Sequence, residues 1–356
     1  MKQDEEIKEE KKSVFPVRRI VLFLGCVIIG FVVLCVILAN QYLSAFSVSS
    51  GLSFNQLWAL VTTTRNQQDH FNNKKLTFLI LGLDKRNDEF EKTLLTDTII
   101  LASLNTDSGQ LTMIPIPRDL WIPELHTKVN ALYFYGEDRA GTTGPVFTAG
   151  EISRITGVPI DYYVVLNYQQ LPELIDAVNG IEVTVEQSFT DDQFPNPRYI
   201  QEASESGEPI YISVSFHAGK QWMSGERALN YVRSRHSESE EGSDLARSRR
   251  QTAVVQALLS RLKQRETLLS PDTLGNVYQF WRNRIETNLA DAEAGTLGLV
   301  TYNKQLSFSS VAIPTVSSQN QPALLLHPPT ATYGQWVWEP RDKSWEELQT
   351  FIQNNL

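Results

Sequence analysis

The sequence predicts an α/β protein, an α/β/α sandwich around a central mixed sheet, preceded by a single transmembrane helix. Short apolar runs rich in Ile, Leu and Thr alternate with segments in which apolar residues recur at helical spacing. This alternation is typical of proteins whose helices cover a sheet. In addition, residues 20–39 contain no charged residue. At about 1.5 Å per residue, a helix of that length crosses the roughly 30 Å hydrocarbon core of a bilayer.

Composition narrows the functional classes. The 356 residues, 42% hydrophobic and 21% charged, are sufficient for a full core. The net charge of −9 argues against nucleic-acid binding through a basic face. Both cysteines, Cys26 and Cys35, lie within the apolar run, so the rest of the chain has no disulfide. With five scattered histidines, oxygen ligands for Mg²⁺ or Mn²⁺ are expected rather than a zinc site.

The flanks of the apolar run predict its orientation. Lys11, Lys12, Arg18 and Arg19 precede it, whereas residues 40–54 contain no Lys or Arg. The positive-inside rule then places the N-terminus in the cytoplasm and the main domain outside the plasma membrane. A cleaved signal peptide is the alternative, but its apolar run would be shorter. The expected division is a cytoplasmic tail at 1–19, an anchor at 20–39, a short helix and linker at 40–75, a main domain at 76–265, and a helical or irregular extension packed on it at 266–356.

Three apolar runs, at 77–83, 98–104 and 110–116, predict strands of the sheet centre. Charged residues flank them: Asp84 and Arg86 follow the first run, Asp97 precedes the second, and Arg118 and Asp119 follow the third. Adjacent strands would bring these charges to one edge of the sheet. Since burying a charge costs several kcal/mol unless it is paired or binds something, this edge is the candidate site.

The following segments fit the helices and strands of such a sandwich. Residues 186–213 are polar and contain Pro195 and Pro197, so we expect a surface excursion with little regular structure. The regular elements expected around it are helices at 144–156, 168–178, 271–286 and 288–302, and strands at 161–167, 181–185 and 306–314.

A second group of charges lies at two helix ends. Ser224 is a plausible N-cap of a helix that ends near Arg233 and Arg235, and Ser243 is an N-cap of the next helix. On that second helix, Asp244, Arg247 and Gln251 share a face that becomes apolar in later turns.

These polar groups therefore point inward at a helix N-terminus, which attracts anions. An ion-pair network among Asp244, Arg247 and Arg235 that only satisfies itself is the alternative interpretation. Together with Arg86 and Arg118, however, the arginines suit a diphosphate, whose oxygens Arg binds bidentately while carboxylates hold a divalent cation.

The ordered set LGLDKR, TDT, IPRD, KVNA, YVRSRH and Asp-x-x-Arg-x-x-Arg-Gln resembles the LytR-CpsA-Psr family of cell-envelope proteins, over roughly residues 77–263. The resemblance implies an extracytoplasmic domain that binds a polyprenyl-phosphate or polyprenyl-diphosphate lipid. It also implies an enzyme that transfers a phosphoglycopolymer, such as teichoic acid or capsular or wall polysaccharide, from that lipid to peptidoglycan, and a hydrophobic tunnel for the lipid tail.

The resemblance assigns roles to residues of this chain. Asp84 and Asp97 would be Mg²⁺ ligands, with Mn²⁺ possible, and Asp97, Arg118 and Asp119 the catalytic residues, Asp119 by orienting Arg118. The residues assigned to the pyrophosphate clamp are Arg86, Arg118, Lys128, Arg233, Arg235, Arg247, Arg250 and Gln251. The sequence departs from the family pattern at Leu83, at Leu245 and Ala246, and in the long loop HSESEEG. These departures bear on glycan specificity and on the place of Arg235.

Two other functional classes remain open at this point. The domain could bind polyprenyl phosphate without chemistry, as a carrier or sensor. It could also be a membrane-tethered transcription attenuator, against which stands a cytoplasmic part of about nineteen residues without a helix-turn-helix pattern. Trp336, Trp338 and Trp345 could contact glycan, although packing is the more common role of tryptophan.

Overall fold

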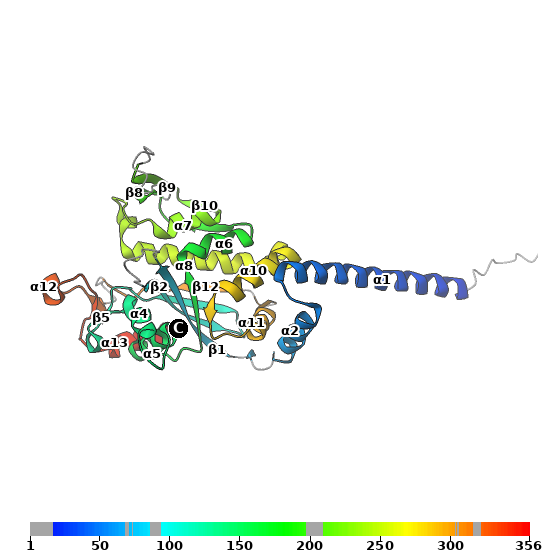
Figure 1. Cartoon of the computed structure of the whole chain (residues 1–356), viewed down its shortest axis with the longest axis horizontal. Helices are drawn as coiled ribbons and strands as arrows, with labels where there is room; N and C mark the ends of the chain where they lie inside the picture. The colour runs from blue at the N-terminus through cyan, green and yellow to red at the C-terminus, as the bar shows by residue number, and fades with distance from the viewer. Residues whose placement is uncertain are drawn as a thin grey trace, which may run out of the picture.

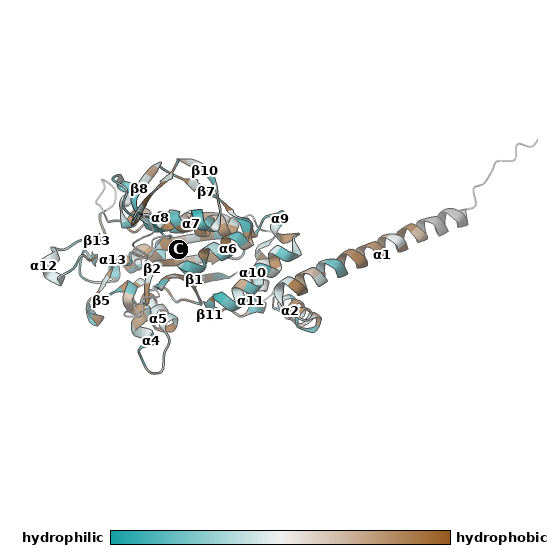
Figure 2. Ribbon diagram, turned by 45° about the horizontal axis from the view of Figure 1, so that its top comes forward, coloured by the Kyte–Doolittle hydropathy of each residue, from teal (hydrophilic) through white to brown (hydrophobic). Residues whose placement is uncertain are grey.

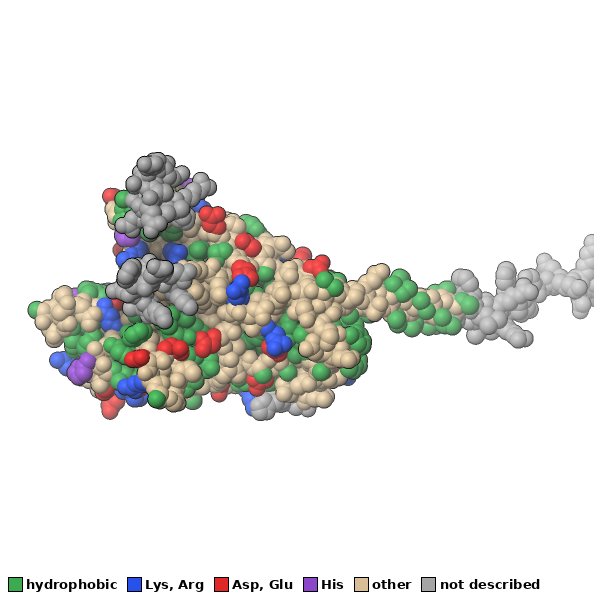
Figure 3. Space-filling model, in the orientation of Figure 1, with side chains coloured by type: hydrophobic (Ala, Val, Ile, Leu, Met, Phe, Trp, Pro, Cys, Tyr) green, Lys and Arg blue, Asp and Glu red, His purple; other side chains and the backbone are tan. Residues whose placement is uncertain are grey.

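The computed structural model describes residues 17–67, 71–72, 74–85, 94–196, 209–302, 304, 306–315 and 322–356. A long helix, α1 (Val17–Ser50), projects from a globular part that contains all other elements (Figure 1). Hydrophobic residues dominate the part of α1 that is coloured by residue type in Figures 2 and 3. From Cys26 to Ser50 the helix is long and apolar enough to cross a membrane.

The globular part is built on a mixed sheet of six strands, in the order β11-β6-β1-β2-β3-β12. Strands β1, β2 and β3 pair antiparallel, whereas β6 runs parallel to β1 and β12 runs parallel to β3. The strands are β1 (Lys75–Lys85), β2 (Leu94–Asn105), β3 (Gln110–Pro115), β6 (Tyr162–Asn167), β11 (Glu286–Thr287) and β12 (Ser307–Ser310).

Alternation along the strands sends apolar side chains to both faces, as in a sheet buried on two sides. Leu79, Leu81 and Leu101 face α4 (Leu132–Glu137), α5 (Gly144–Thr156) and α13 (Glu346–Asn355). Ile100 and Met113 face the opposite way, toward Val255 and Leu259 of α8 (Asp244–Leu262). Helices therefore cover both faces of a mixed sheet (Figure 1), which confirms the predicted sandwich.

A second apolar cluster lies on the side of α8 that faces away from the sheet, and it holds the helices and the ribbon there together. It joins α6 (Leu171–Ala177), α7 (Gly225–Arg233) and a ribbon of β7 (Ile181–Val185) and β10 (Gly219–Met223). The remaining short elements are β4 (Trp121–Ile122), β5 (Thr127–Lys128), α12 (Thr330–Tyr333), β13 (Leu325–Leu326) and β14 (Glu339–Pro340).

The segment predicted as a short helix and linker is packed on the globular part. Helix α1 continues to Ser50, and α2 (Phe54–Asn66) follows it with a capping box at Ser53. The Tyr42 hydroxyl donates to the carbonyl of Leu268 (2.7 Å), and Ser49 Oγ donates to the carbonyl of Pro271 (3.2 Å). These bonds hold α1 against α9 (Arg265–Leu268) and α10 (Pro271–Arg284).

Two expected features differ from the structure. The boundary expected at residue 265 does not separate two units, because β11 and β12 lie beyond it in the chain and complete the edges of the same sheet. The segment at 186–213 is not irregular throughout, since β8 (Phe189–Pro195) and β9 (Tyr211–Phe216) form an antiparallel ribbon. Along β9 the exposed Tyr211, Ser213 and Ser215 alternate with Ile212, Val214 and Phe216. This alternation is the pattern of a half-buried strand, which the expectation for the segment overlooked.

Candidate functional site

Three strand ends meet at one edge of the sheet. Because β1, β2 and β3 are antiparallel neighbours, the end of β1, the start of β2 and the end of β3 coincide, and these carry Asp84, Asp97 and Arg118. Asp97 is set apart by a β-bulge: Gly82 pairs with Thr98 and Leu83 with Thr96, which leaves Asp97 unpaired in the ladder. Bulges next to active sites re-aim side chains in this way.

Arg118 links the sheet edge to the start of α8. Its Nη1 donates to Asp97 Oδ1 (2.8 Å) and its Nη2 to Asp244 Oδ2 (3.3 Å). Its Nε lies 3.3 Å from Asp119 Oδ2. Burial would lower the pKa of Arg118, but Asp97, Asp244 and Asp119 together raise it above its ordinary value, so the guanidinium stays charged. The sheet edge and α8, predicted from distant parts of the sequence, thus meet through this residue.

Asp119 is buried and is held from two sides. One oxygen faces Arg118, and the other accepts a hydrogen bond from Lys128 Nζ at 2.7 Å. Lys128 lies on β5, which pairs with β4 directly after Asp119. Lys128 is not among the residues that line the cavity described below, so its contact is with Asp119.

The first turns of α8 point their polar residues inward as predicted. Ser243 caps the helix by accepting from the backbone N–H of Ala246 (3.2 Å). Arg247 and Gln251 are each only 5% exposed. Arg247 Nη2 pairs with Asp244 Oδ1 at 3.1 Å, while its buried Nε has no hydrogen-bond partner among the described residues. This arginine therefore has an unused donor.

Gln251 is positioned by Tyr168, a residue that the sequence did not single out. Gln251 Nε2 donates to the Tyr168 hydroxyl (2.6 Å), which also contacts the hydroxyl of Thr98. Gly82 leaves the space for this ring, since a Cβ there would lie 3.2 Å from Tyr168 Cζ and 2.9 Å from Thr98 Cβ. Burial, and secondarily Asp97, raise the pKa of Tyr168, so the hydroxyl remains protonated.

The end of α7 supplies the opposite wall. Arg233 Nη2 donates to Asp84 Oδ1 (3.3 Å), which ties α7 to the end of β1. Beyond it, the backbone N–H groups of Arg235 and His236 both donate to Asp191 Oδ2 on β8, at 2.9 and 3.2 Å. Asp191 thereby fixes the loop that presents Arg235.

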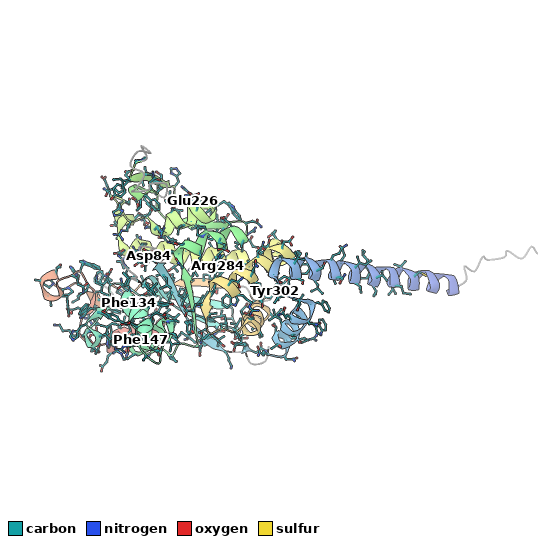
Figure 4. The ribbon with its side chains drawn as sticks, viewed as in Figure 1. Asp84, Phe134, Phe147, Glu226, Arg284 and Tyr302 are labelled. Atoms are coloured by element: carbon teal, nitrogen blue, oxygen red, sulfur yellow. The ribbon has the colours of Figure 1, made fainter. Side chains whose placement is uncertain are left out.

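These residues enclose a cavity of about 640 Å³. Figure 4 labels Asp84, at the end of β1, and Glu226, on α7, and both line the cavity. The cavity is lined by Asp84, Asp97, Tyr168, Phe194, Pro195, Asn196, Tyr211, Glu226, Leu229, Asn230, Val232, Arg233, Arg235, His236, Arg247 and Gln251. Carboxylates, arginines and an apolar wall thus meet in one space.

Arg250 does not belong to this cavity, contrary to its predicted place in the clamp. It is 2% exposed, and its Nη1 donates to both the carbonyl and Oε2 of Glu241 at 2.8 Å. Its Nε donates to the carbonyl of Tyr231 (3.0 Å), and its Nη2 to the carbonyl of Ser234. Its donors therefore hold the loop after α7 on α8 and are not directed at a ligand. Arg86 lies outside the described residues.

Sequence reasoning missed the residues that the β8–β9 ribbon and the outer face of α7 contribute. Phe194, Tyr211, Glu226 and Asn230 line the cavity together with Tyr168. Glu226 and Asn230 are four residues apart on α7, and Asn230 in turn precedes Arg233 by three, which is a shared helix face that the sequence pattern contained. The alternation along β9 indicated a strand, but nothing in the sequence placed the ribbon beside the site.

Among the residues that the structure describes, no group of three or more His, Cys, Asp or Glu side chains is arranged to hold a metal ion. The carboxylates that line the cavity are Asp84, Asp97 and Glu226. Asp84 and Asp97 come from adjacent strands, and each directs Oδ1 to an arginine.

The LytR_cpsA_psr family model matches residues 53–354. The chain is 26% identical over 215 residues to the polyisoprenyl-teichoic acid–peptidoglycan teichoic acid transferase TagU of Enterococcus faecalis, which covers 59% of this chain and 61% of that protein. It is 25% identical over 298 residues to TagV of Bacillus subtilis, in an alignment that covers 82% of this chain and 67% of that protein. The chain spans about 60% of the length of TagU from E. faecalis and from Bacillus cereus.

Solved structures share the fold. The crystal structure of B. subtilis TagV superposes with a TM-score of 0.56 at 21% identity, over 80% of this chain and 98% of that chain. A LytR-CPS2A-psr family protein, YwtF (TagT), with bound octaprenyl pyrophosphate lipid, has a TM-score of 0.50 at 20% identity, over 80% and 92% of the two chains.

Proposed function

From the premise that the chain belongs to the LytR-CpsA-Psr family, we propose that it transfers a phosphoglycopolymer from a polyprenyl-diphosphate lipid to peptidoglycan. Relatives bear the name teichoic acid transferase, and a fold neighbour binds octaprenyl pyrophosphate. The observation that carries the proposal is the position of Arg118. It is not itself among the residues that line the cavity, but it is bonded to Asp97, which lines the cavity with three other arginines, and to Asp244 of α8.

In this proposal, arginines bind the diphosphate of the donor. Arg233, Arg235 and Arg247 line the cavity, and Arg forks match phosphate oxygens bidentately. The unpartnered Nε of Arg247 is a donor that an anion would satisfy, since an unpaired buried donor is costly. Gln251, held by Tyr168, would donate beside it.

Asp84 and Asp97 fit a Mg²⁺ or Mn²⁺ ion. Mg²⁺ is commonly held by one or two carboxylates, with waters and substrate phosphates as its other ligands. Two carboxylates on adjacent strands, without a third acidic or histidine ligand in the described part of the chain, suit that arrangement. When bound, the ion would neutralise charge on the phosphates.

The reaction needs positioning and charge stabilisation more than covalent chemistry. A sugar hydroxyl of peptidoglycan attacks the phosphorus that carries the glycan. The bond from that phosphorus to the bridging oxygen breaks, and polyprenyl phosphate leaves with the bridging oxygen. Arg118, charged and fixed by Asp97 and Asp119, stabilises the transferred phosphoryl group. Asp97, through its position beside the proposed metal site, is our candidate for accepting the hydroxyl proton.

The lipid tail requires apolar surroundings. Phe194, Leu229 and Val232 give the cavity an apolar side, on which we place the first isoprenoid units. The longer tunnel that the family resemblance implies remains part of this proposal. The anchoring helix and the domain outside the plasma membrane complete it, and fusion of a reporter to the C-terminus tests that orientation.

A single-turnover assay tests the proposal. The full chain is mixed with lipid-linked glycopolymer, peptidoglycan and Mg²⁺, and both polyprenyl phosphate and polymer-linked peptidoglycan are measured. We expect the two products in equal amounts, and their loss when the metal is chelated. Lipid that binds without either product would identify a carrier or sensor and overturn the transferase. Product formation at full rate in chelator would remove the metal from the mechanism.

A further inference from the structure

Exposed apolar side chains surround the base of α1. Phe54, Trp58 and Val61 of α2 are 61%, 60% and 47% exposed, and Leu269, directly after α9, is 72% exposed. Both α2 and α9 lie at the end of the globular part from which α1 projects (Figures 1 and 2). We call these four residues the base patch.

Helix α2 has an apolar face that points outward, although packing alone would favour polar residues there. A surface helix ordinarily turns its apolar stripe toward the core. In α2, Leu57 and Thr64 face inward, where the carbonyl of Thr64 accepts from Thr296 Oγ1 of α11 (Asp291–Tyr302) at 3.0 Å. Phe54, Trp58 and Val61, spaced by four and three residues, form a second apolar face that points outward.

The charge distribution matches a lipid surface. The sequence has no Asp, Glu, Lys or Arg from residue 20 to residue 64, so α2 carries its first charge at Arg65, in its last turn. The charge-free stretch thus extends well beyond the length that a membrane span needs. Trp and Phe on a helix of this kind are typical of the membrane–water interface.

Contacts between α1 and α9 set the level of the patch. The Tyr42 hydroxyl bonds to the carbonyl of Leu268, and Tyr42 follows the end of the apolar run at residue 39 by about 4.5 Å along the helix. Leu269 is therefore held at the height where the hydrocarbon core would end. Gly275 permits this close approach, since a Cβ there would collide with Ser49.

We propose that Phe54, Trp58, Val61 and Leu269 insert into the interface of the bilayer that α1 crosses, and hold the globular part against the membrane. The patch is continuous with α1 and is spread over separate elements around its base, an arrangement that suits a planar lipid surface. The proposal rests on α1 as a membrane span and is independent of the transfer reaction.

Tryptophan quenching by brominated lipid tests this placement. The full chain is incorporated into phosphatidylcholine nanodiscs in which bromine is attached at shallow acyl positions. Of the seven tryptophans, only Trp58 belongs to the patch. We expect Trp58→Phe to remove the bromine-quenchable part of the emission. The matched control is Trp222→Phe on β10, where the tryptophan is similarly exposed at 57% and should leave the quenched part unchanged.

A second variant tests the shared role of the patch. Leu269→Ser changes an exposed side chain, so the fold is retained. We expect it to reduce quenching of Trp58 by about half, because one of the apolar side chains that hold the patch in the bilayer is lost. Equal quenching of the wild type and Trp58→Phe would overturn the proposal. So would cross-linking of α2 to α2 in a second copy of the chain with Trp58 unquenched, because the patch would then be a protein contact.

Discussion

Arg247 and Arg250 lie three residues apart on α8, and both are nearly inaccessible, at 5% and 2% exposed. Arg250 donates hydrogen bonds to the carbonyls of Tyr231, Ser234 and Glu241 and to the Glu241 carboxylate. Arg247 pairs with the half-exposed Asp244 and lines the cavity, and its Nε has no hydrogen-bond partner in the described part of the chain. Burial of an arginine therefore does not identify its role, whereas the partners of its donors do.

The buried Arg250 and Arg118 of the candidate site also differ in how their surroundings shift the pKa of the guanidinium. Burial lowers the pKa of Arg250, a shift that Glu241 opposes. At the sheet edge, Asp97, Asp244 and Asp119 outweigh burial and raise the pKa of Arg118. The structural arginine is thus satisfied by carbonyls and one carboxylate, while the candidate site concentrates carboxylates and arginines around an open space. Substitutions can separate these two roles.

The largest effect is expected for Arg250→Ala. The change leaves the buried Glu241 carboxylate and the carbonyls of Tyr231 and Ser234 without their donor. Breaking such a buried pair costs roughly 3–5 kcal/mol of the free energy of unfolding. Thermal or denaturant unfolding of the full chain in detergent measures it, with Arg247→Ala as the matched control, expected to unfold nearly as the wild type. If Arg250→Ala unfolds normally, the contrast between the two arginines is wrong.

Arg118→Ala is expected to lower transfer by about 100-fold or more with normal unfolding, as the loss of one preorganised donor does elsewhere. Arg118 bonds to Asp97, which lines the cavity, and to Asp244. The buried Asp119 keeps Lys128 as its partner when Arg118 is removed, so we expect the variant to remain folded. Single-turnover rates at matched expression measure the effect. Near-normal transfer would exclude Arg118 from the reaction.

Arg247→Lys is expected to lower transfer by about tenfold. Lysine keeps the charge but loses the planar fork and the free Nε donor, and a hydrogen bond to a charged group contributes about 1.5 kcal/mol. Binding of polyprenyl diphosphate, measured separately, should weaken by a similar factor. A variant that binds and reacts like the wild type would show that the fork is not used.

The smallest effect is expected for Lys128→Met. Lys128 contacts Asp119 and does not line the cavity, so it acts only by positioning the partner of Arg118. A partly exposed ion pair contributes about 1 kcal/mol or less, which corresponds to about a fivefold loss or less. We expect kcat to fall while KM for the lipid donor is unchanged. A large rise in KM instead would place Lys128 on the diphosphate.

Much of the fold could be predicted because its signals are local. The apolar runs of β1, β2 and β3 and the caps at Ser224 and Ser243 each lie within a few residues of sequence. The convergence of the sheet edge with α8 followed from the placement of charges at element ends. The β8–β9 ribbon was missed because Pro195, Pro197 and the polar composition of the segment were weighed above the alternation of apolar and polar residues in β9.

The rest of the site depends on tertiary contacts. The sequence motif Asp-x-x-Arg-x-x-Arg-Gln contains both Arg247 and Arg250. Their roles are separated by the partners of Arg250, which are the carbonyls of Tyr231 and Ser234 at the end of α7 and Glu241 in the loop before α8. Likewise, the bulge that frees Asp97 follows from the register of β1 against β2 and has no signature of its own.

The direction of β1 has a consequence for substrate size. Leu76, at its beginning, packs with Leu289 and Leu297 beside the helices around the base of α1, and Asp84 lies near its end. From Leu76 to Asp84 an extended strand covers up to about 26 Å. In the proposed function the diphosphate is held near Asp84, so a prenyl tail has to span this separation before its far end reaches the helices around the base of α1. Donors with much shorter tails should therefore be poor substrates.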